Sequence, residues 1–263
     1  MTRGPLLPGM TTRRGDREPP TRRAVLAGTG ALTLSALAGC LRGSGAGGTD
    51  GDAAGGSPTA GGSSDDVTTT EETQTLENHP AAAGLADQPY RGPDPFEAEA
   101  VIVDFSDPSC PTCRRFEEDV VPRITSELVD PGRAAFVFRV YPVIYPWGEP
   151  ATQALESTYA RDEDAFWSLK DFYYAEQSSF DETNVLSRTR EHLAAETNLD
   201  ADAVVDDAEA KAHDAAVQSD LTAGMEAGAG RTTPHLFLFR DGEFRTKAAG
   251  SVSYSVIENA LGL

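Results

Sequence analysis

The stretch VIVDFSDPSCPTCRRFEEDVVP, residues 101–122, contains the pattern from which the fold can be inferred. Its beginning continues an apolar, β-branched run, and we expect a buried strand over Glu99–Asp107. After the two cysteines, apolar residues recur at four-residue spacing from Phe116 to Leu128, which is typical of one face of a helix. Pro122 should kink this helix because its ring removes a main-chain hydrogen bond. The sequence therefore predicts a strand, two cysteines and a kinked helix.

The elements that follow give the fold class. A second apolar run, Ala134–Val143, predicts another strand, so strand, helix and strand form a parallel βαβ unit. Residues from about 149 to 227 have a helical pattern with no flexible linker at either edge, and we expect an insertion packed on the sheet. HLFLFRDGEFRTKAAG predicts two strands around the Asp241-Gly242 turn, and SYSVIENALGL a closing helix. We predict an α/β fold, βαβ then ββα, around a mixed central sheet.

The charge of the chain restricts its partners. It has 22 Lys and Arg against 42 Asp and Glu, a formal net charge of −20, which excludes nucleic acid as a partner because phosphates require the opposite sign. The acid-rich, lysine-poor composition resembles that of proteins from salt-loving archaea, in which molar salt shortens the Debye length to about 3 Å and screens the repulsion. The alternative is an ordinary acidic protein in dilute buffer.

The N-terminus has the pattern of an export signal. TRRAVLAGTGALTLSALAGC places Arg22-Arg23 before an apolar run, Ala24–Ala38, that is too short for a confident membrane-spanning helix. The paired arginines resemble the twin-arginine signal, which exports folded proteins. The run ends in a sequence that resembles a lipobox, which implies cleavage before Cys40 and a lipid on its thiol. We predict a lipoprotein signal peptide over residues 1–39; the alternative is a small-residue stretch with an accidental cysteine.

A change of composition marks the next segment. Residues 40–87 are rich in Gly, Ser, Thr and Asp and have no apolar period, so we expect a disordered tether, with an end-to-end distance of roughly 35–40 Å, before a folded domain over residues 88–263. If Cys40 carries lipid, Cys110 and Cys113 are the remaining cysteines. Outside the cytosol, a disulfide between them is chemically natural.

Three kinds of chemistry fit two cysteines separated by two residues. A structural zinc site requires four Cys or His ligands, and the four histidines lack the usual ligand spacing, so we predict no metal and no cofactor. A purely structural disulfide would stabilise little, because the closed loop is so short. A redox-active pair fits better: main-chain N–H groups at the start of the helix favour a Cys110 thiolate. Cys113, one turn later, can attack a mixed disulfide formed on Cys110.

With this order of elements, the cysteine stretch resembles the active site of the thioredoxin superfamily, and the helical insertion is similar to that of its DsbA-like branch. The resemblance covers about residues 88–263. It implies a cis-proline loop opposite the cysteines, with Thr233 and Pro234 binding an extended substrate; the alternative is a proline that merely starts a strand. It also implies that Asp104, six residues before Cys110, is a buried acid that relays a proton; the alternative is a solvent-facing carboxylate.

The resemblance implies a thiol–disulfide oxidoreductase, tethered by lipid to the extracytoplasmic face of the cell membrane. Its partners would be cysteine-containing exported proteins, which it oxidises or isomerises, and a membrane redox partner. Pro111-Thr112, between the cysteines, lacks both the histidine of strongly oxidising DsbA proteins and the Gly-Pro of thioredoxin, so the direction of electron flow stays open. The alternatives are a reductase for cytochrome or metal-centre assembly and a non-catalytic, thioredoxin-like binding lipoprotein.

Overall fold

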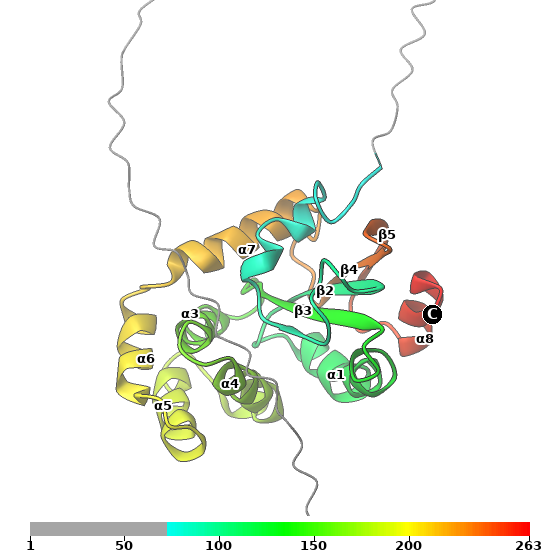
Figure 1. Cartoon of the computed structure of the whole chain (residues 1–263). Helices are drawn as coiled ribbons and strands as arrows, with labels where there is room; N and C mark the ends of the chain where they lie inside the picture. The colour runs from blue at the N-terminus through cyan, green and yellow to red at the C-terminus, as the bar shows by residue number, and fades with distance from the viewer. Residues whose placement is uncertain (1–72) are drawn as a thin grey trace, which may run out of the picture. The chain divides into compact units, whose positions relative to one another are not determined.

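The computed structural model describes residues 73–263 (Figure 1). The predicted signal peptide, the predicted lipid site at Cys40 and most of the predicted tether lie outside these residues.

A five-stranded sheet forms the centre of the domain, in the order β1-β3-β2-β4-β5. Its strands are β1 (Tyr90–Arg91), β2 (Ala100–Ser106), β3 (Ala134–Val140), β4 (His235–Arg240) and β5 (Glu243–Ala249). β2 runs parallel to β3, whereas β1 with β3, β2 with β4 and β4 with β5 are antiparallel pairs. Every residue of β2 and β3 is buried, because elements cover both faces of the sheet at its centre. The predicted α/β fold with a mixed sheet is confirmed.

The helix after β2 is broken where the proline predicts it. Val120 caps the C-terminal end of α1 (Pro111–Asp119). α2 (Val121–Ile124) then continues into a π-helical turn, η3 (Thr125–Val129). Pro122 lies in the first turn of α2, where its missing N–H costs no helical hydrogen bond. The apolar face of this segment packs with α8 (Tyr254–Leu261) on one face of the sheet.

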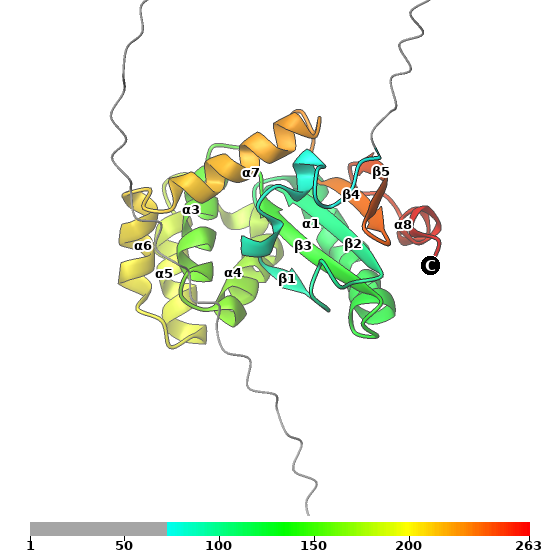
Figure 2. The same cartoon turned by 45° about the horizontal axis from the view of Figure 1, so that its top comes forward.

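The helical insertion between β3 and β4 contains α3 (Gly148–Tyr159), α4 (Glu163–Ala175), a 3₁₀ turn η4 (Gln177–Ser179), α5 (Val185–Glu196), α6 (Ala201–Glu209) and α7 (Asp214–Glu226). Figures 1 and 2 show α3–α6 gathered beside the sheet, with α7 returning from them toward β4. The aromatic core of this insertion is continuous with Cys110 and Cys113. The predicted insertion therefore contributes directly to the surroundings of the cysteine pair.

The folded part begins earlier in the chain than the predicted residue 88. Residues 73–87 contain two 3₁₀ turns, η1 (Pro80–Ala82) and η2 (Leu85–Asp87), and Thr75 forms a β-bridge to Glu243. The buried Arg139 guanidinium donates to the carbonyls of Ala81 and Ala83, at 2.9 and 2.7 Å, and forms an ion pair with Asp220 of α7. Long-range contacts order this segment, and its own composition does not predict them.

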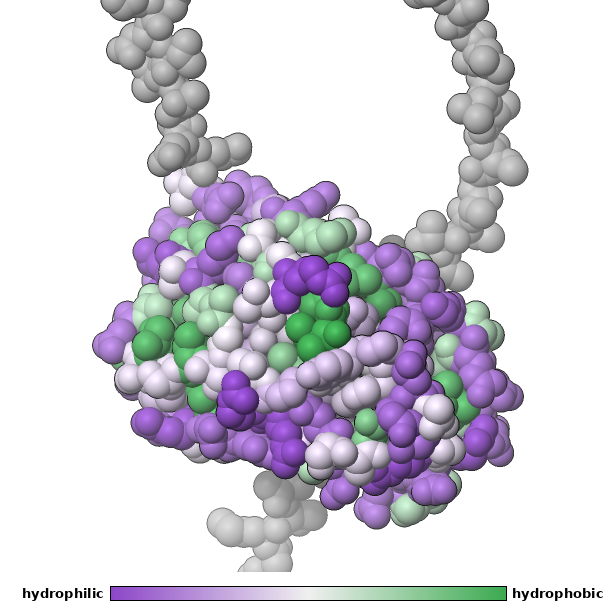
Figure 3. Space-filling view, turned by 180° about the vertical axis from the view of Figure 1, so that it is seen from behind, coloured by the Kyte–Doolittle hydropathy of each residue, from purple (hydrophilic) through white to green (hydrophobic). Residues whose placement is uncertain are grey.

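One face of the domain is mainly polar. Figure 3 shows one face on which hydrophilic side chains predominate and hydrophobic side chains form only small, separate areas. Within residues 73–263, no helix combines the length and the apolar character needed to cross a bilayer.

Candidate active site

Cys110 and Cys113 lie where β2 gives way to α1. Cys110 is the N-terminal capping residue of α1, with extended backbone angles, and Pro111 occupies the first helical position. Both cysteines are reduced thiols, and they are 4% and 1% exposed. Both side chains are thus almost completely covered, and the Cys113 thiol forms a hydrogen bond with Cys110.

The two thiols differ in acidity. A hydrogen bond from the Cys113 thiol is the largest influence on Cys110, and together with the N–H groups of Thr112 and Cys113 it lowers the Cys110 pKa to about 5 against the opposing effect of burial. Burial raises the pKa of Cys113 well above its usual range, and the hydrogen bond to Cys110 adds to this. At neutral pH, Cys110 is therefore a thiolate and Cys113 a thiol.

This asymmetry predicts the pH profile of alkylation. The rate of reaction with iodoacetamide should rise with an apparent pKa of about 5 and level off by about pH 7, because only the thiolate of Cys110 reacts. Stopped-flow or quenched alkylation across pH 4–9 measures it. Cys113→Ala removes the hydrogen-bond donor and should shift the midpoint upward, whereas Cys113→Ser keeps a donor and should shift it less. A wild-type midpoint near 8.5 would contradict the assignment.

Thr233 and Pro234 lie directly against Cys110. The peptide bond between them is cis, as predicted, and it precedes β4. In its protonated form, the Cys110 thiol donates to the Thr233 carbonyl at 3.4 Å. The side chain of Thr233 is buried, and its interaction with the sulfur also lowers the pKa of Cys110. The loop thus brings main-chain groups of Thr233 beside the reactive sulfur.

Asp104 is buried in the middle of β2. It is 0% exposed, which excludes a solvent-facing carboxylate, and the Ser106 hydroxyl donates to its two oxygens, at 2.8 Å each. Burial is the main cause that raises the Asp104 pKa to about 7, although the Ser106 hydrogen bond opposes the shift. Near neutral pH, Asp104 can therefore either give or accept a proton.

The sequence analysis missed a buried charge pair near Asp104. Lys170 of α4 is 1% exposed and forms ion pairs with Glu117 of α1 and, at 3.1 Å, with Asp171. Glu117 raises the Asp104 pKa and Lys170 lowers it, so the two charges offset each other in part. The available signal was helical spacing, since Lys170 lies three residues after the buried Trp167 and therefore on the same face of α4.

Asp107 fixes the loop that leads into Cys110. Its carboxylate accepts from the N–H and hydroxyl of Ser109, at 2.8 and 2.6 Å, and from the N–H groups of Val143 and Ile144, both at 2.8 Å. These bonds join the cysteine loop to the segment after β3. The Asp107 side chain leaves no space for a side chain at Gly148, because a Cβ there would lie 2.5 Å from the Asp107 Oδ1. The sequence analysis did not identify this network.

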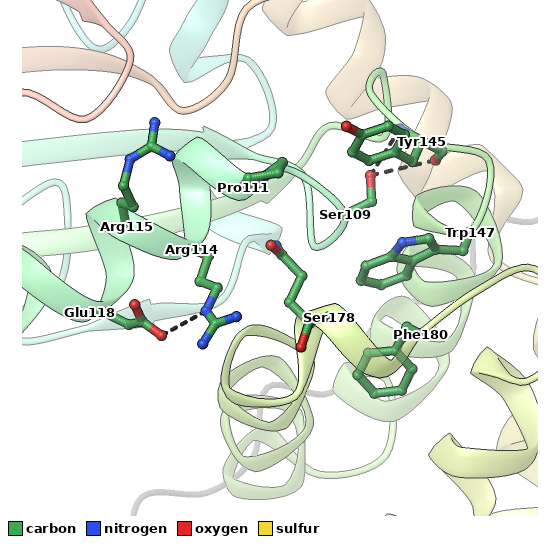
Figure 4. A pocket seen from close by; sticks show the side chains of 10 residues that line it. Ser109, Pro111, Arg114, Arg115, Glu118, Tyr145, Trp147, Ser178 and Phe180 are labelled. Carbon is green, nitrogen blue, oxygen red and sulfur yellow. Dashed lines mark hydrogen bonds and ion pairs between the residues drawn. The ribbon is translucent and has the colours of Figure 1, made fainter.

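The surface next to Cys110 is hollowed. A cavity of about 500 Å³ lies between α1 and the helical insertion, and both neighbours of Cys110, Ser109 and Pro111, line it (Figure 4). Within residues 73–263, no group of three or more His, Cys, Asp and Glu side chains is placed to hold a metal ion.

A βαβ unit and a ββα unit around two cysteines at the start of a helix define a thioredoxin fold. A family model described as thioredoxin matches residues 94–250, more than half of the sequence, and the chain therefore belongs to the thioredoxin family.

Curated relatives share only part of their length with this chain. It is 33% identical over 81 residues to the probable disulfide bond formation protein D of Bacillus anthracis, an alignment that covers 31% of this chain and 37% of that protein. It is 30% identical over 108 residues to disulfide bond formation protein D of Bacillus subtilis, covering 40% of this chain and 47% of the relative. The alignments thus span less than half of either relative.

Solved structures confirm the architecture. The oxidised crystal structure of BdbD from Bacillus subtilis superposes with a TM-score of 0.58 at 19% identity, covering 73% of this chain and 97% of that one. That of alpha-DsbA1 from Wolbachia pipientis gives 0.55 at 19% identity, covering 66% of this chain and 89% of that one. At such identities these similarities establish the shared fold, including the helical insertion.

Proposed function

We propose that this protein is a thiol–disulfide oxidoreductase that introduces or rearranges disulfides in exported polypeptides. One observation carries the proposal: the pKa of Cys110 is lowered to about 5, while that of its neighbour Cys113 is raised. A good leaving group beside a buried attacking thiol is the arrangement that disulfide exchange requires. The names of the bacterial relatives, disulfide bond formation protein D, agree with this activity.

The same asymmetry favours oxidation of clients over their reduction. A Cys110 thiolate stabilised by hydrogen bonds lowers the free energy of the reduced pair relative to its disulfide. The disulfide is then readily given up to a client. A reductase for cytochrome or metal-centre assembly would need the opposite balance.

The exchange proceeds in two attacks. In the oxidised protein, a client thiolate attacks the Cys110 sulfur, the bond between Cys110 and Cys113 breaks, and Cys113 leaves with the electron pair. Asp104, whose pKa is raised to about 7, supplies the proton that the buried Cys113 takes up. A second client thiolate then attacks the client sulfur, and Cys110 leaves as a thiolate. The client gains a disulfide, and the two electrons remain on the cysteine pair.

Other parts of the chain complete this cycle. Thr233 and Pro234, which lie beside the Cys110 sulfur, would hold an extended client segment during both attacks. A membrane redox partner would withdraw the two electrons and restore the disulfide. For the N-terminus we propose export through the signal at residues 1–39 and a lipid at Cys40, which the order of paired arginines, apolar run and cysteine supports. Mass spectrometry of the intact protein from membranes tests the lipid.

The reduction potential of the cysteine pair tests the direction of electron flow. Equilibration with a glutathione series should give a potential of about −120 mV, typical of an oxidant, rather than about −270 mV, typical of a reductant. In parallel, the oxidised protein should accelerate disulfide formation in a reduced, unfolded test protein, whereas Cys110→Ser should not. Biological activity that survives in Cys110→Ser would instead support a non-catalytic binding lipoprotein.

A further inference from the structure

We propose that the cavity beside Cys110 binds client segments that carry a carboxylate close to the reacting cysteine. This inference rests on the proposed function and specifies its substrates. The cavity lies between α1 and the helical insertion, and Ser109 and Pro111 line it on either side of Cys110 (Figure 4). A client joined covalently to Cys110 therefore has its neighbouring residues at the mouth of the cavity.

Hydrogen bonds on both sides fix the walls of the cavity relative to Cys110. On one side, the Ser109 hydroxyl donates to Asp107 at 2.6 Å and accepts from the N–H of Tyr145 at 3.0 Å. On the other side, the amide of Gln177 donates to the Cys110 carbonyl at 3.0 Å. A surface fixed in this way loses little conformational entropy when a ligand binds, so more of the contact energy contributes to affinity.

Aromatic side chains line part of the cavity. Tyr145 is 52% exposed, although its backbone is held by Ser109. The rings of Trp147 and Phe180 lie 5.3 Å apart, and Figure 4 shows them side by side at the cavity. Tyr145 gives an exposed ring on a fixed backbone, which offers contact area at a low entropic cost, whereas Trp147 and Phe180 are only 7% and 8% exposed and form part of the cavity wall. These rings suit the side chains of an unfolded polypeptide.

The charges at this site favour an acidic segment. Arg114 and Arg115 both line the cavity. The Arg114 Nε donates to the Glu118 Oε1 at 2.7 Å, so these two residues form an ion pair. Arg115 is exposed and donates to Thr112 at 3.1 Å; the described part of the chain offers it no carboxylate within ion-pair distance. In a chain with 42 acidic and 22 basic residues, a guanidinium without such a partner is available for a carboxylate on another molecule.

Matched peptides test this inference. Two disulfide-linked peptide dimers, identical except for Glu or Gln next to the cysteine, are mixed with the reduced protein in the Cys113→Ser background, and adduct formation on Cys110 is followed by mass spectrometry. At low ionic strength, the Glu peptide should react about two to five times faster than the Gln peptide, as expected for one exposed ion pair. Arg115→Gln should bring this ratio close to one. The control Arg245→Gln, at an exposed arginine that pairs with Glu243 on β5, should leave it unchanged.

The outcomes separate the two proposals. If both peptides react but their ratio is one in the wild type, or is the same in Arg115→Gln, the acidic-segment inference is wrong and the proposed function stands. If neither peptide forms an adduct on Cys110, the proposed function fails, and this inference fails with it. A preference that disappears with Arg115 and persists in Arg245→Gln supports the inference.

Discussion

Replacing Cys113 with serine should turn a transient mixed disulfide into a stable covalent adduct between Cys110 and its client. The Cys113 thiol forms a hydrogen bond with Cys110, and its attack on the mixed disulfide is intramolecular. Such attacks have very high effective molarities, so only slow reaction with external thiols remains, and adduct breakdown should slow by at least about a thousandfold. Non-reducing electrophoresis and mass spectrometry of adducts formed in cells measure the effect.

The matched control is the neighbouring thiol. Cys110→Ser leaves Cys113, which is 1% exposed and has a raised pKa, and it should collect no clients. Equal amounts of adduct in both variants would show that the assignment of attacking and resolving cysteines is wrong.

Replacing Asp104 with asparagine should stabilise the protein at alkaline pH. The pKa of Asp104 is 3.8 in the unfolded chain and about 7 in the folded protein, so only the folded protein holds this proton between these values. The free energy of unfolding therefore falls as the pH rises from about 4 to 7, by about 4 kcal/mol in total. Asparagine has no such proton to lose. We expect the variant to gain about 4 kcal/mol at pH 8 and almost nothing at pH 4, as measured by urea unfolding.

A substitution at Lys170 provides a control in which the free energy of unfolding should change in the opposite direction. Lys170→Met leaves Glu117 and Asp104 without their buried cation and should lower the free energy of unfolding by about 3–5 kcal/mol at pH 8.

Asp104→Asn should also slow disulfide exchange, because the proton relay to Cys113 is lost. An Asp104→Asn variant that keeps the wild-type dependence of stability on pH would show that another group titrates in this range.

Local patterns predicted much of the fold. The apolar run of β2 and the spacing of apolar residues along α1 and α2 are short-range signals, as is the position of Pro122, and each element formed where its pattern lay. The start of the folded part was predicted too late. Residues 73–87 have a tether-like composition, and they are ordered by Arg139, which contacts them from β3 more than fifty positions away. No local pattern contains that information.

The candidate site shows the same difference between residues that local sequence patterns predict and residues that only long-range contacts bring in. Cys110 and Cys113 are close in the sequence and their spacing predicted their pairing, whereas the place of Asp104 followed from the resemblance to the thioredoxin superfamily. Lys170 and Glu117 are separated by 53 positions, and although helical spacing from Trp167 indicates that Lys170 faces inward, it does not identify Glu117 as its partner. Tyr145 was also missed, because hydrogen bonds of its main chain, including the one between its N–H and the Ser109 hydroxyl, fix it at the cavity beside Cys110. Contacts between distant elements supplied each part of the site that the sequence did not predict.

The β-bridge between Thr75 and Glu243 fixes the end of the sheet at which the chain enters the folded domain. It lies beside the β4–β5 turn, whereas Cys110 follows the opposite end of β2, one strand length of about 20 Å away across the sheet. With the lipid anchor that we propose at Cys40, the chain would enter the folded domain at the end of the sheet that is remote from Cys110.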